Sequence, residues 1–382
     1  MRIGIDGRVL GRQRTGIGNY IHGLVQFLPQ VGPEHDYFFY SNREIDLPVS
    51  GKRVNEQIDR AFCWCPGSIW LRGRGGSLAH RDQLDVFWAT FPILPTGVPR
   101  GVLKLVTVYD LVWLRFPETT SNYALWVQKI WARKAIEKAD LIVTISRSTM
   151  EDLVRELGVP ERKIRCVYPG VFERYTPHDR QQAAEYMSRK YSVPPRYMAA
   201  VGTVEPRKNL KLLVEVVRIL KSTGQLKCPL LVVGANGWKN SPLFRQMRAA
   251  GLTEDEIRFL GYLPDEDLPY FYSGADVFLF PTLYEGFGLP PIEAMACGTP
   301  IIASNARCMP EVLGDAAILE PPDGAQRFAD AILKLRADVN LRHAMREAGL
   351  RKAEEYCWQA SAKQLLGLID NGINQGEAYA KY

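Results

Sequence analysis

Residues 284–293 read YEGFGLPPIE and follow a short apolar run, Val277–Phe280. Such a run, ended by a proline, is typical of a buried strand. Pro290 and Pro291 can only open a helix, because proline suits the first helical turn and disrupts later turns. The stretch therefore predicts a strand, a glycine loop and a helix start, an arrangement in which free N–H groups face an anion.

Two carboxylates flank this loop. Glu285 stands at its start, and Glu293 is expected in the first turn of the following helix. Carboxylates repel a bare phosphate, so the ligand is expected to carry hydroxyl groups for them as well. A phosphorylated sugar meets both demands. The alternative for Glu293 is a favourable interaction with the helix dipole.

A second motif, residues 201–209 (VGTVEPRKN), follows another predicted strand at 198–201. It places Arg207 and Lys208 at a helix start. Two adjacent cations suit a diphosphate, since arginine engages two oxygens and lysine acts as a point charge. They would neutralise a departing nucleoside diphosphate without a metal. The alternative, a solvated pair, is weakened because cations are disfavoured at a helix start.

Strands and helices alternate along the whole chain, with one break at residues 169–178. A chain of 382 residues is too long for one ordinary core. Two successive alternating runs predict an α/β protein with two doubly wound parallel sheets. We expect the domains to cover residues 1–175 and 176–357.

The first domain offers two further candidates. Gly16 and Gly18 follow the first predicted strand, and could cradle a phosphate or simply form a tight turn. The strand at 102–108 ends at Tyr109 and Asp110. Ligands bind at the carboxyl ends of strands in open parallel sheets, which favours chemistry for Asp110. Its alternative role is turn-making.

Residues 60–82 interleave aromatic and basic side chains in a segment whose glycines are expected to loosen the chain. Such a segment could bind an anionic lipid headgroup or an acceptor glycan. The alternative is a solvated loop whose tryptophans pack on the domain. The candidate residues are Trp64, Trp70, Arg72, Arg74 and Arg81.

Composition narrows the class of partner and the compartment. A formal net charge of +6 favours anionic ligands or lipid surfaces and does not call for nucleic acid. Seven scattered cysteines favour reduced thiols in the cytoplasm. No apolar stretch approaches the roughly 20 residues that span a bilayer. The acidic run at 265–267 follows a proline, so we interpret it as a helix cap and predict no metal site.

The EPRKN and YEGFGLP motifs, with the second glutamate eight residues after the first, resemble those of family 4 retaining glycosyltransferases. The resemblance covers nearly the whole chain and includes bacterial mannosyltransferases of surface-polysaccharide synthesis. It implies the GT-B fold, with two Rossmann-like domains facing a central cleft. The N-terminal domain would hold the acceptor and the C-terminal domain the nucleotide sugar. The last helix, about 358–382, would cross back to the first domain.

The resemblance also implies roles for single residues. Arg207 and Lys208 would bind the diphosphate, Glu293 the ribose, and Glu285 the sugar and phosphate. The other donor-binding residues would be Gly16, Gly18, Thr203, Gly286, Phe287, Gly288 and Leu289. Catalysis would involve Asp110, Glu285 and Tyr109. Tyr109 stands where the family often has histidine, and a tyrosine with a pKa of about 10 cannot act as an imidazole at neutral pH.

These expectations describe a metal-independent, retaining hexosyltransferase without a cofactor. Mannose from GDP-mannose is favoured as the donor, and the acceptor would be a glycan or lipid-linked oligosaccharide of polysaccharide or lipopolysaccharide synthesis. The enzyme would be cytoplasmic, with peripheral contact at the inner face of the cytoplasmic membrane. The alternatives are a UDP-glucose or dTDP-sugar transferase, a sugar-nucleotide epimerase, a phosphorylase, or a non-catalytic nucleotide-sugar-binding relative.

Overall fold

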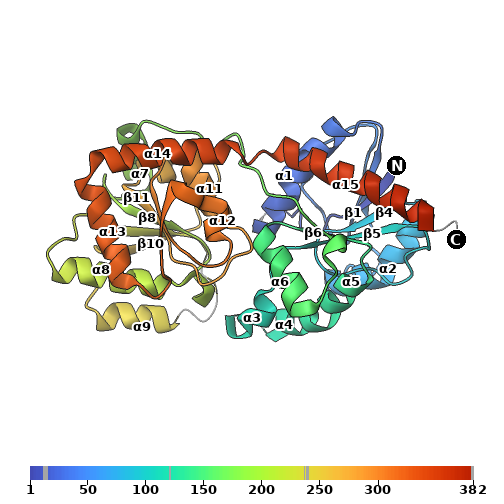
Figure 1. The fold of residues 1–382 in the computed structure, drawn as a ribbon, viewed down its shortest axis with the longest axis horizontal. Coiled ribbons are helices and arrows are strands. Elements are labelled where there is room, and N and C mark those ends of the chain that lie inside the picture. The colour runs from blue at the N-terminus through green and yellow to red at the C-terminus, as the bar shows by residue number, and fades with distance from the viewer. Residues whose placement is uncertain (12–15, 120–121, 236, 238–240, 380–382) are drawn as a thin grey trace. The chain divides into compact units, whose positions relative to one another are not determined.

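The computed structural model describes residues 1–11, 16–119, 122–235, 237 and 241–379 (Figure 1). The chain divides into two compact units. Unit 1 contains Met1–Gly170 and Cys357–Tyr382, and unit 2 contains Val171–Tyr356.

Unit 1 is built on a parallel sheet, to which the described residues contribute seven strands in the order β3-β2-β1-β4-β5-β6-β7. The strands are β1 (Arg2–Asp6), β2 (Asp36–Ser41), β3 (Val54–Ile58), β4 (Val86–Ala89), β5 (Leu103–Val108), β6 (Leu141–Thr144) and β7 (Ile164–Cys166). The helices are α1 (Gly16–Val31), α2 (Gly67–Arg81), α3 (Val112–Arg115), α4 (Asn122–Val127), α5 (Arg133–Lys138), α6 (Arg147–Leu157) and α15 (Trp358–Tyr379), with a π-helical segment at Gln128–Ala132. The strand order reverses between β1 and β4, the position at which such sheets bind ligands.

Unit 2 repeats this plan with a parallel sheet of six described strands in the order β10-β9-β8-β11-β12-β13. The strands are β8 (Met198–Val201), β9 (Leu230–Val233), β10 (Ile257–Gly261), β11 (Val277–Phe280), β12 (Ile301–Ser304) and β13 (Ala317–Glu320). The helices are α7 (Arg180–Tyr191), α8 (Leu210–Ser222), α9 (Ser241–Ala249), α10 (Leu268–Gly274), α11 (Leu289–Ala296), α12 (Met309–Leu313), α13 (Ala325–Ala337) and α14 (Val339–Glu354). The order here reverses between β8 and β11.

Apolar side chains cover both faces of the unit 2 sheet. On β11, Val277 and Leu279 join the core cluster that contains residues of α8 and α13. Phe278 lies on the opposite face, where its ring packs edge-on against Tyr272 of α10. Burial on both faces explains why the strands read as continuous apolar runs. The predicted α/β class with two doubly wound parallel sheets is confirmed.

The segment at 60–82 is neither loosened by its glycines nor the loop of the alternative interpretation, because α2 occupies most of it. Its glycines serve close packing. A Cβ atom on Gly75 would lie 2.6 Å from Pro95 Cγ, and one on Gly76 would lie 2.0 Å from the Thr96 carbonyl oxygen. Glycine therefore lets α2 lie directly against the chain at 95–97.

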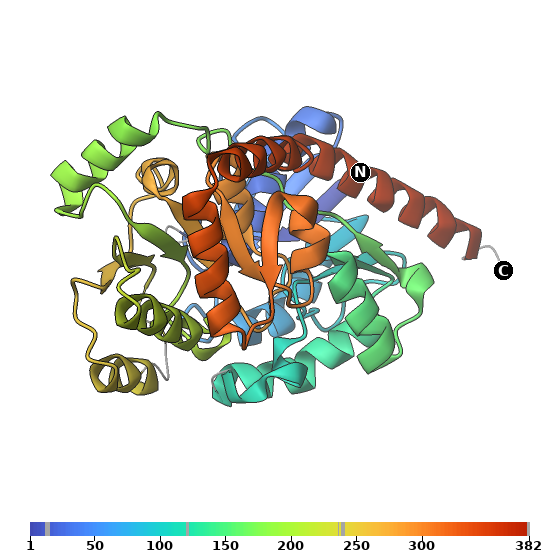
Figure 2. The same ribbon diagram turned by 60° about the vertical axis from the view of Figure 1, so that its left-hand side comes forward.

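The last helix packs in unit 1, where α15 lies beside α1 (Figures 1 and 2). Its first residue, Trp358, is 2% exposed. A Cβ atom on Gly23 of α1 would lie 2.3 Å from the Trp358 ring, so glycine is needed for this contact. Ser361 Oγ donates a hydrogen bond to the Tyr168 carbonyl at 2.6 Å.

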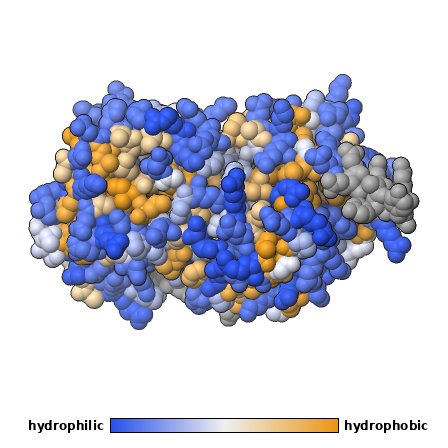
Figure 3. Space-filling model, in the orientation of Figure 1, coloured by the Kyte–Doolittle hydropathy of each residue, from blue (hydrophilic) through white to orange (hydrophobic). Residues whose placement is uncertain are grey.

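Polar side chains cover much of the face drawn in Figure 3, with apolar patches between them. Among the described residues, no helix is both long enough and apolar enough to cross a membrane.

Candidate active site

Two loops at the carboxyl ends of β8 and β11 meet in unit 2. Since these strands are parallel neighbours, the loops at 202–209 and 281–288 leave the sheet at the same edge. Several hydrogen bonds join them. The Leu283 N–H donates to the Arg207 carbonyl at 2.9 Å, and Asn209 Nδ2 donates to the Pro281 carbonyl at 3.0 Å. Residues more than 70 positions apart in the sequence thus form one site.

Glu285 is the centre of this site. Its Oε2 lies 2.8 Å from Arg207 Nη1, and its Oε1 pairs with Lys208 Nζ. Arg207 Nη2 also lies 2.6 Å from Glu205 Oε1. Burial by itself raises the pKa of Glu285, but the charges of Arg207 and Lys208 outweigh this and hold the pKa at about 2. The carboxylate is therefore ionised at neutral pH and fixes both cations in place.

The glycine loop between Glu285 and α11 offers backbone N–H groups as hydrogen-bond donors. Gly288 has φ +93°, and a Cβ atom there would lie 2.8 Å from Met309 Cε, so both conformation and space require glycine. In the described part of the chain, the N–H groups of Gly286 and Gly288 donate to no backbone or side-chain acceptor. The Phe287 side chain is buried, edge-on to Tyr356 with ring centroids 5.3 Å apart. Leu289 begins α11.

Glu293 lies in α11 beyond the first turn in which it was expected. Its side chain is buried, and Tyr272 Oη donates a hydrogen bond to Glu293 Oε2 at 2.8 Å. Burial raises the pKa of Glu293 to about 7, although hydrogen bonds from Tyr272 and Tyr175 oppose the rise. The dipole alternative is therefore wrong, and Glu293 belongs to a buried network with two tyrosines.

Thr203 lies in the loop after β8, next to the end of β9. A Cβ atom on Gly237 would lie 2.8 Å from Thr203 Cγ2, and one on Gly234 would lie 2.1 Å from the Gly202 carbonyl oxygen. The chain after β9 therefore passes close to this loop.

In unit 1, Tyr109 and Asp110 follow β5. Tyr109 is buried, and its Oη donates a hydrogen bond to the Thr90 carbonyl at 2.6 Å. Burial raises the pKa of Tyr109 well above its usual value. Asp110 Oδ1 accepts a hydrogen bond from the Val112 N–H at 3.1 Å, so the side chain makes the turn that was its alternative role. Asp110 is half-buried, and its catalytic role stays a prediction.

Helix α1 begins at Gly16, which is exposed and has no atom within 4 Å of an added Cβ. Gly18 is buried one half-turn later. Thr15, the residue before Gly16 in the sequence, lies outside the described residues. The approach of both glycines to a phosphate stays a prediction.

The five aromatic and basic candidates of residues 60–82 do not form one exposed set. Trp70 is 1% exposed and its Nε1 lies 3.3 Å from Asp59 Oδ2, so the prediction that it contacts lipid or acceptor is wrong. Trp64 is 79% exposed. The three arginines have partners within unit 1: Arg72 lies over the Trp131 ring, Arg74 pairs with Asp59, and Arg81 pairs with Asp82.

Sequence reasoning missed Glu205, Tyr272 and Tyr175 as parts of the unit 2 site. Glu205 stands two residues before Arg207 within the EPRKN motif, and this spacing is a signal for an ion pair. The tyrosines come from distant segments and carry no local signal, because only the fold brings them to Glu293.

The acidic run at 265–267 was predicted to cap a helix. Asp267 is at the N-cap position of α10, but its side chain makes no capping hydrogen bond. Its carboxylate instead accepts hydrogen bonds from Tyr186 Oη and Tyr191 Oη and pairs with Lys190 Nζ at 2.8 Å. No group of three or more histidine, cysteine, aspartate or glutamate side chains within the described ranges is arranged to hold a metal.

Comparison with known proteins agrees with this architecture. Residues 14–173 match the family described as Glycosyltransferase Family 4, and residues 187–352 match Glycosyl transferases group 1. The chain is 31% identical to O-antigen chain mannosyltransferase B of Escherichia coli, over 78% of this chain and 77% of that protein.

Two solved structures share the fold along nearly the whole chain. Sucrose-phosphate synthase from Thermosynechococcus elongatus has a TM-score of 0.78 at 20% identity, covering 97% of this chain and 98% of that one. Anabaena HepE in complex with UDP and glucose has a TM-score of 0.73 at 15% identity, covering 97% and 100%. The two parallel-sheet units thus define a glycosyltransferase of the GT-B fold. The chain belongs to glycosyltransferase family 4.

Proposed function

We propose that this enzyme transfers mannose from GDP-mannose, with retention and without a metal, to a glycan or lipid-linked glycan in polysaccharide or lipopolysaccharide synthesis. The observation that carries the proposal is the pairing of Arg207 and Lys208 with Glu285 beside the glycine loop. The relative that is an O-antigen chain mannosyltransferase supports the choice of mannose.

The donor diphosphate would be held by the side chains of Arg207 and Lys208 together with the N–H groups of Gly286 and Gly288. A nucleoside diphosphate brings more negative charge than one carboxylate, so it competes with Glu285 for Lys208. Glu285 then accepts hydrogen bonds from sugar hydroxyls. Glu293, fixed by Tyr272, would accept hydrogen bonds from the ribose.

In the transfer step, the bond from the sugar C1 to the diphosphate oxygen breaks and a bond from C1 to the acceptor oxygen forms. Arg207 and Lys208 stabilise the charge that develops on the leaving diphosphate. The proton of the acceptor hydroxyl passes to the departing phosphate, so no side chain has to act as a strong base. Asp110 would orient the acceptor. The buried Tyr109 hydroxyl would support this region through its hydrogen bond to Thr90.

A UDP-glucose or dTDP-sugar donor is the second candidate, because a structural neighbour is in complex with UDP and glucose. A thermal-shift panel of GDP-, UDP-, dTDP- and ADP-sugars and their diphosphates, with and without chelator, distinguishes these donors. A ligand that binds only the native state raises the melting temperature. We expect the largest shift from GDP and GDP-mannose, unchanged by chelator. A shift from UDP alone would replace mannose by another donor, and no shift from any nucleotide would contradict the proposal.

We also propose peripheral contact with anionic membrane through Trp64. Its ring is 79% exposed and lies beside the 54% exposed Phe62, with ring centroids 6.2 Å apart. Exposed aromatic rings favour the membrane interface. Co-sedimentation with phosphatidylglycerol vesicles should fall in Trp64→Ser and stay unchanged in the matched variant Tyr262→Ser, which removes an exposed ring from unit 2. Equal binding by both variants would contradict this contact.

A further inference from the structure

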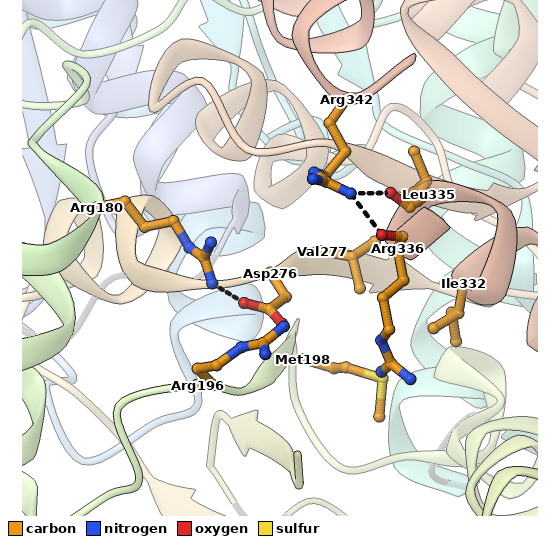
Figure 4. Close-up of a pocket in the computed structure, with 9 residues that line it drawn as sticks. All are labelled: Arg180, Arg196, Met198, Asp276, Val277, Ile332, Leu335, Arg336 and Arg342. Atoms are coloured by element: carbon orange, nitrogen blue, oxygen red, sulfur yellow. Dashed lines mark hydrogen bonds and ion pairs between the residues drawn. The ribbon is translucent and has the colours of Figure 1, made fainter. Parts of the chain in front are cut away.

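A cavity of about 110 Å³ in unit 2 is ringed by arginines (Figure 4). It is lined by Arg180, Arg196, Arg336 and Arg342, with Asp276 as the one acidic side chain among the lining residues. Four arginines and one aspartate give a net formal charge of +3, half of the +6 carried by the whole chain. Like charges gathered around one cavity repel one another, so an anion between them is stabilising.

The cavity lies at the edge of the sheet opposite to the proposed donor site. Met198, which lines the cavity, is the first residue of β8, and Val277 is the first residue of β11. The donor-site loops begin after the last residues of the same two strands. The strands separate the two groups of cations, so the cavity is a different site.

Ion pairs within the protein neutralise only part of this positive charge. Arg196 Nη2 lies 2.8 Å from Asp276 Oδ2, and Arg180 pairs with Asp276 Oδ1, so two guanidinium groups share one carboxylate. Burial and the charges of Arg196 and Arg342 lower the pKa of Arg180.

The other two arginines bind only neutral acceptors. Arg342 Nη1 donates to the carbonyls of Leu335 and Arg336 at the end of α13, where a cation also meets the helix dipole. Arg336 Nη1 donates to the Gln225 carbonyl at 2.7 Å. Among the described residues, no carboxylate lies within 4.0 Å of either guanidinium. The interaction with the end of α13 accounts for the positive charge of Arg342. The positive charge of Arg336, beside the cavity, has no compensating anion among the described residues.

Size and donor geometry define the ligand. One water takes up about 30 Å³ of liquid, so a cavity of about 110 Å³ has room for a few heavy atoms. The planar guanidinium fork matches the oxygens of a phosphate group. The side chains of Arg180 and Arg196 are 52% and 56% exposed, so the cavity is open to solvent and the rest of a larger ligand can remain outside.

We propose that this cavity is a second anion site, distinct from the donor site, that binds a phosphoryl group. The group belongs either to a free phosphate ligand or to a phosphomonoester lipid headgroup, since both offer the same oxygens to the arginines.

The test compares Arg196→Gln/Arg336→Gln with a control, Arg327→Gln/Arg351→Gln, which removes two exposed arginines from α13 and α14 outside the cavity. Arg180 and Arg342 are kept so that Asp276 and the end of α13 retain partners. Binding of inorganic phosphate is measured by calorimetry at low ionic strength. Binding to phosphatidylcholine vesicles with and without phosphatidic acid is measured by co-sedimentation. Lys208→Met is measured alongside, because it alters the other cationic site.

We expect the cavity variant to bind phosphate or phosphatidic acid vesicles at least about 100-fold more weakly, since it loses two charge-assisted hydrogen bonds and each costs more than the interaction energy of one factor of ten. The control should retain this binding, whereas Lys208→Met should weaken only phosphate binding at the donor site and leave binding at the cavity in place. Loss of the phosphate signal identifies a free ligand, and loss of the vesicle signal alone identifies a lipid headgroup. The proposal is overturned if the folded single variant Arg336→Gln and the double variant both bind the probes as tightly as the control does. It is also overturned if the unaltered protein binds neither phosphate nor phosphatidic acid vesicles.

Discussion

At the scale of single residues, one carboxylate organises the proposed donor site. Glu285 holds Arg207 and Lys208 at once, and all three side chains are at most 17% exposed. Separate cations at a protein surface lose much of their effect to solvent and salt. Partly buried cations in fixed positions act on a leaving group without first reorganising.

Replacing Lys208 tests this arrangement. Lys208→Met keeps much of the side-chain volume and removes the charge, so the turnover of sugar transfer should fall on the order of 100-fold. Lys211→Met, an exposed position on α8, should change turnover less than twofold. Steady-state kinetics on both variants provide the measurement. Equal turnover in the two variants would mean that Lys208 does not act on the diphosphate.

Glu293 makes a prediction about pH. Its pKa is raised from an ordinary value of 4.5 to about 7. Between these values the native state keeps the proton that the unfolded state has lost, so stability is full below about pH 4.5 and falls as the pH rises through 7. The loss is on the order of 3 kcal/mol.

The variant Glu293→Gln cannot ionise and should lack this component. Melting temperatures at pH 5 and pH 8 should therefore differ less in the variant than in the unaltered protein, because all other titrating groups are shared. If both proteins lose the same number of degrees, the Glu293 carboxyl does not titrate in this window.

At the scale of elements, motifs at strand ends could be predicted, whereas the edge strands without a buried residue could not. The strand, loop and helix around residues 277–296 were predicted because the apolar run, glycines and prolines lie next to one another in sequence. The strands β3 and β13 were missed. Both are edge strands without a buried residue, so they lack the continuous apolar pattern of the inner strands.

Helix α2 was missed because its glycines were interpreted as signs of a loop. The sequence shows Gly73, Gly75 and Gly76 but not the chain that packs on two of them. Likewise, Trp70 could not be told from Trp64 by residue type, although one is buried and the other exposed.

A matched pair of substitutions in α2 tests this explanation. Gly76→Ala should destabilise unit 1 by about 1–3 kcal/mol, because its Cβ meets a backbone oxygen that cannot move aside easily. Gly73→Ala meets no atom within 4 Å and should stabilise the helix by about 0.5–1 kcal/mol. Urea unfolding measures both. A similar change in both variants would show that the contact with Thr96 does not matter.

At the scale of the whole molecule, the chain forms two units that are not two continuous halves. Unit 1 contains both ends of the chain, since α15 packs beside α1. The family 4 assignment and the GT-B fold followed from the motifs, because each motif ties residue chemistry to a strand end. The contacts of α15 with Gly23 and Tyr168 depend on tertiary packing and had no counterpart in the local pattern.

Truncation tests the dependence of unit 1 on its last helix. A chain that ends at Tyr356 removes Trp358 and exposes the surface of α1 that it covers. Amide hydrogen exchange should accelerate in β1 and α1 by more than about 100-fold, while β8 and β11 keep their protection. A chain that ends at Ile373 retains every residue of α15 that the structure describes as buried, and it serves as the control. Unchanged protection of β1 in the shorter chain would contradict this dependence.

The most direct test of the proposed function follows the sugar itself. The enzyme is incubated with GDP-mannose and a mannoside acceptor, and NMR records both the release of GDP and the anomeric configuration of the product. We predict one GDP released for each mannosyl bond formed, with an α-linked product from the α-linked donor, unaffected by chelator. A β-linked product, or transfer from UDP-glucose alone, would contradict the account.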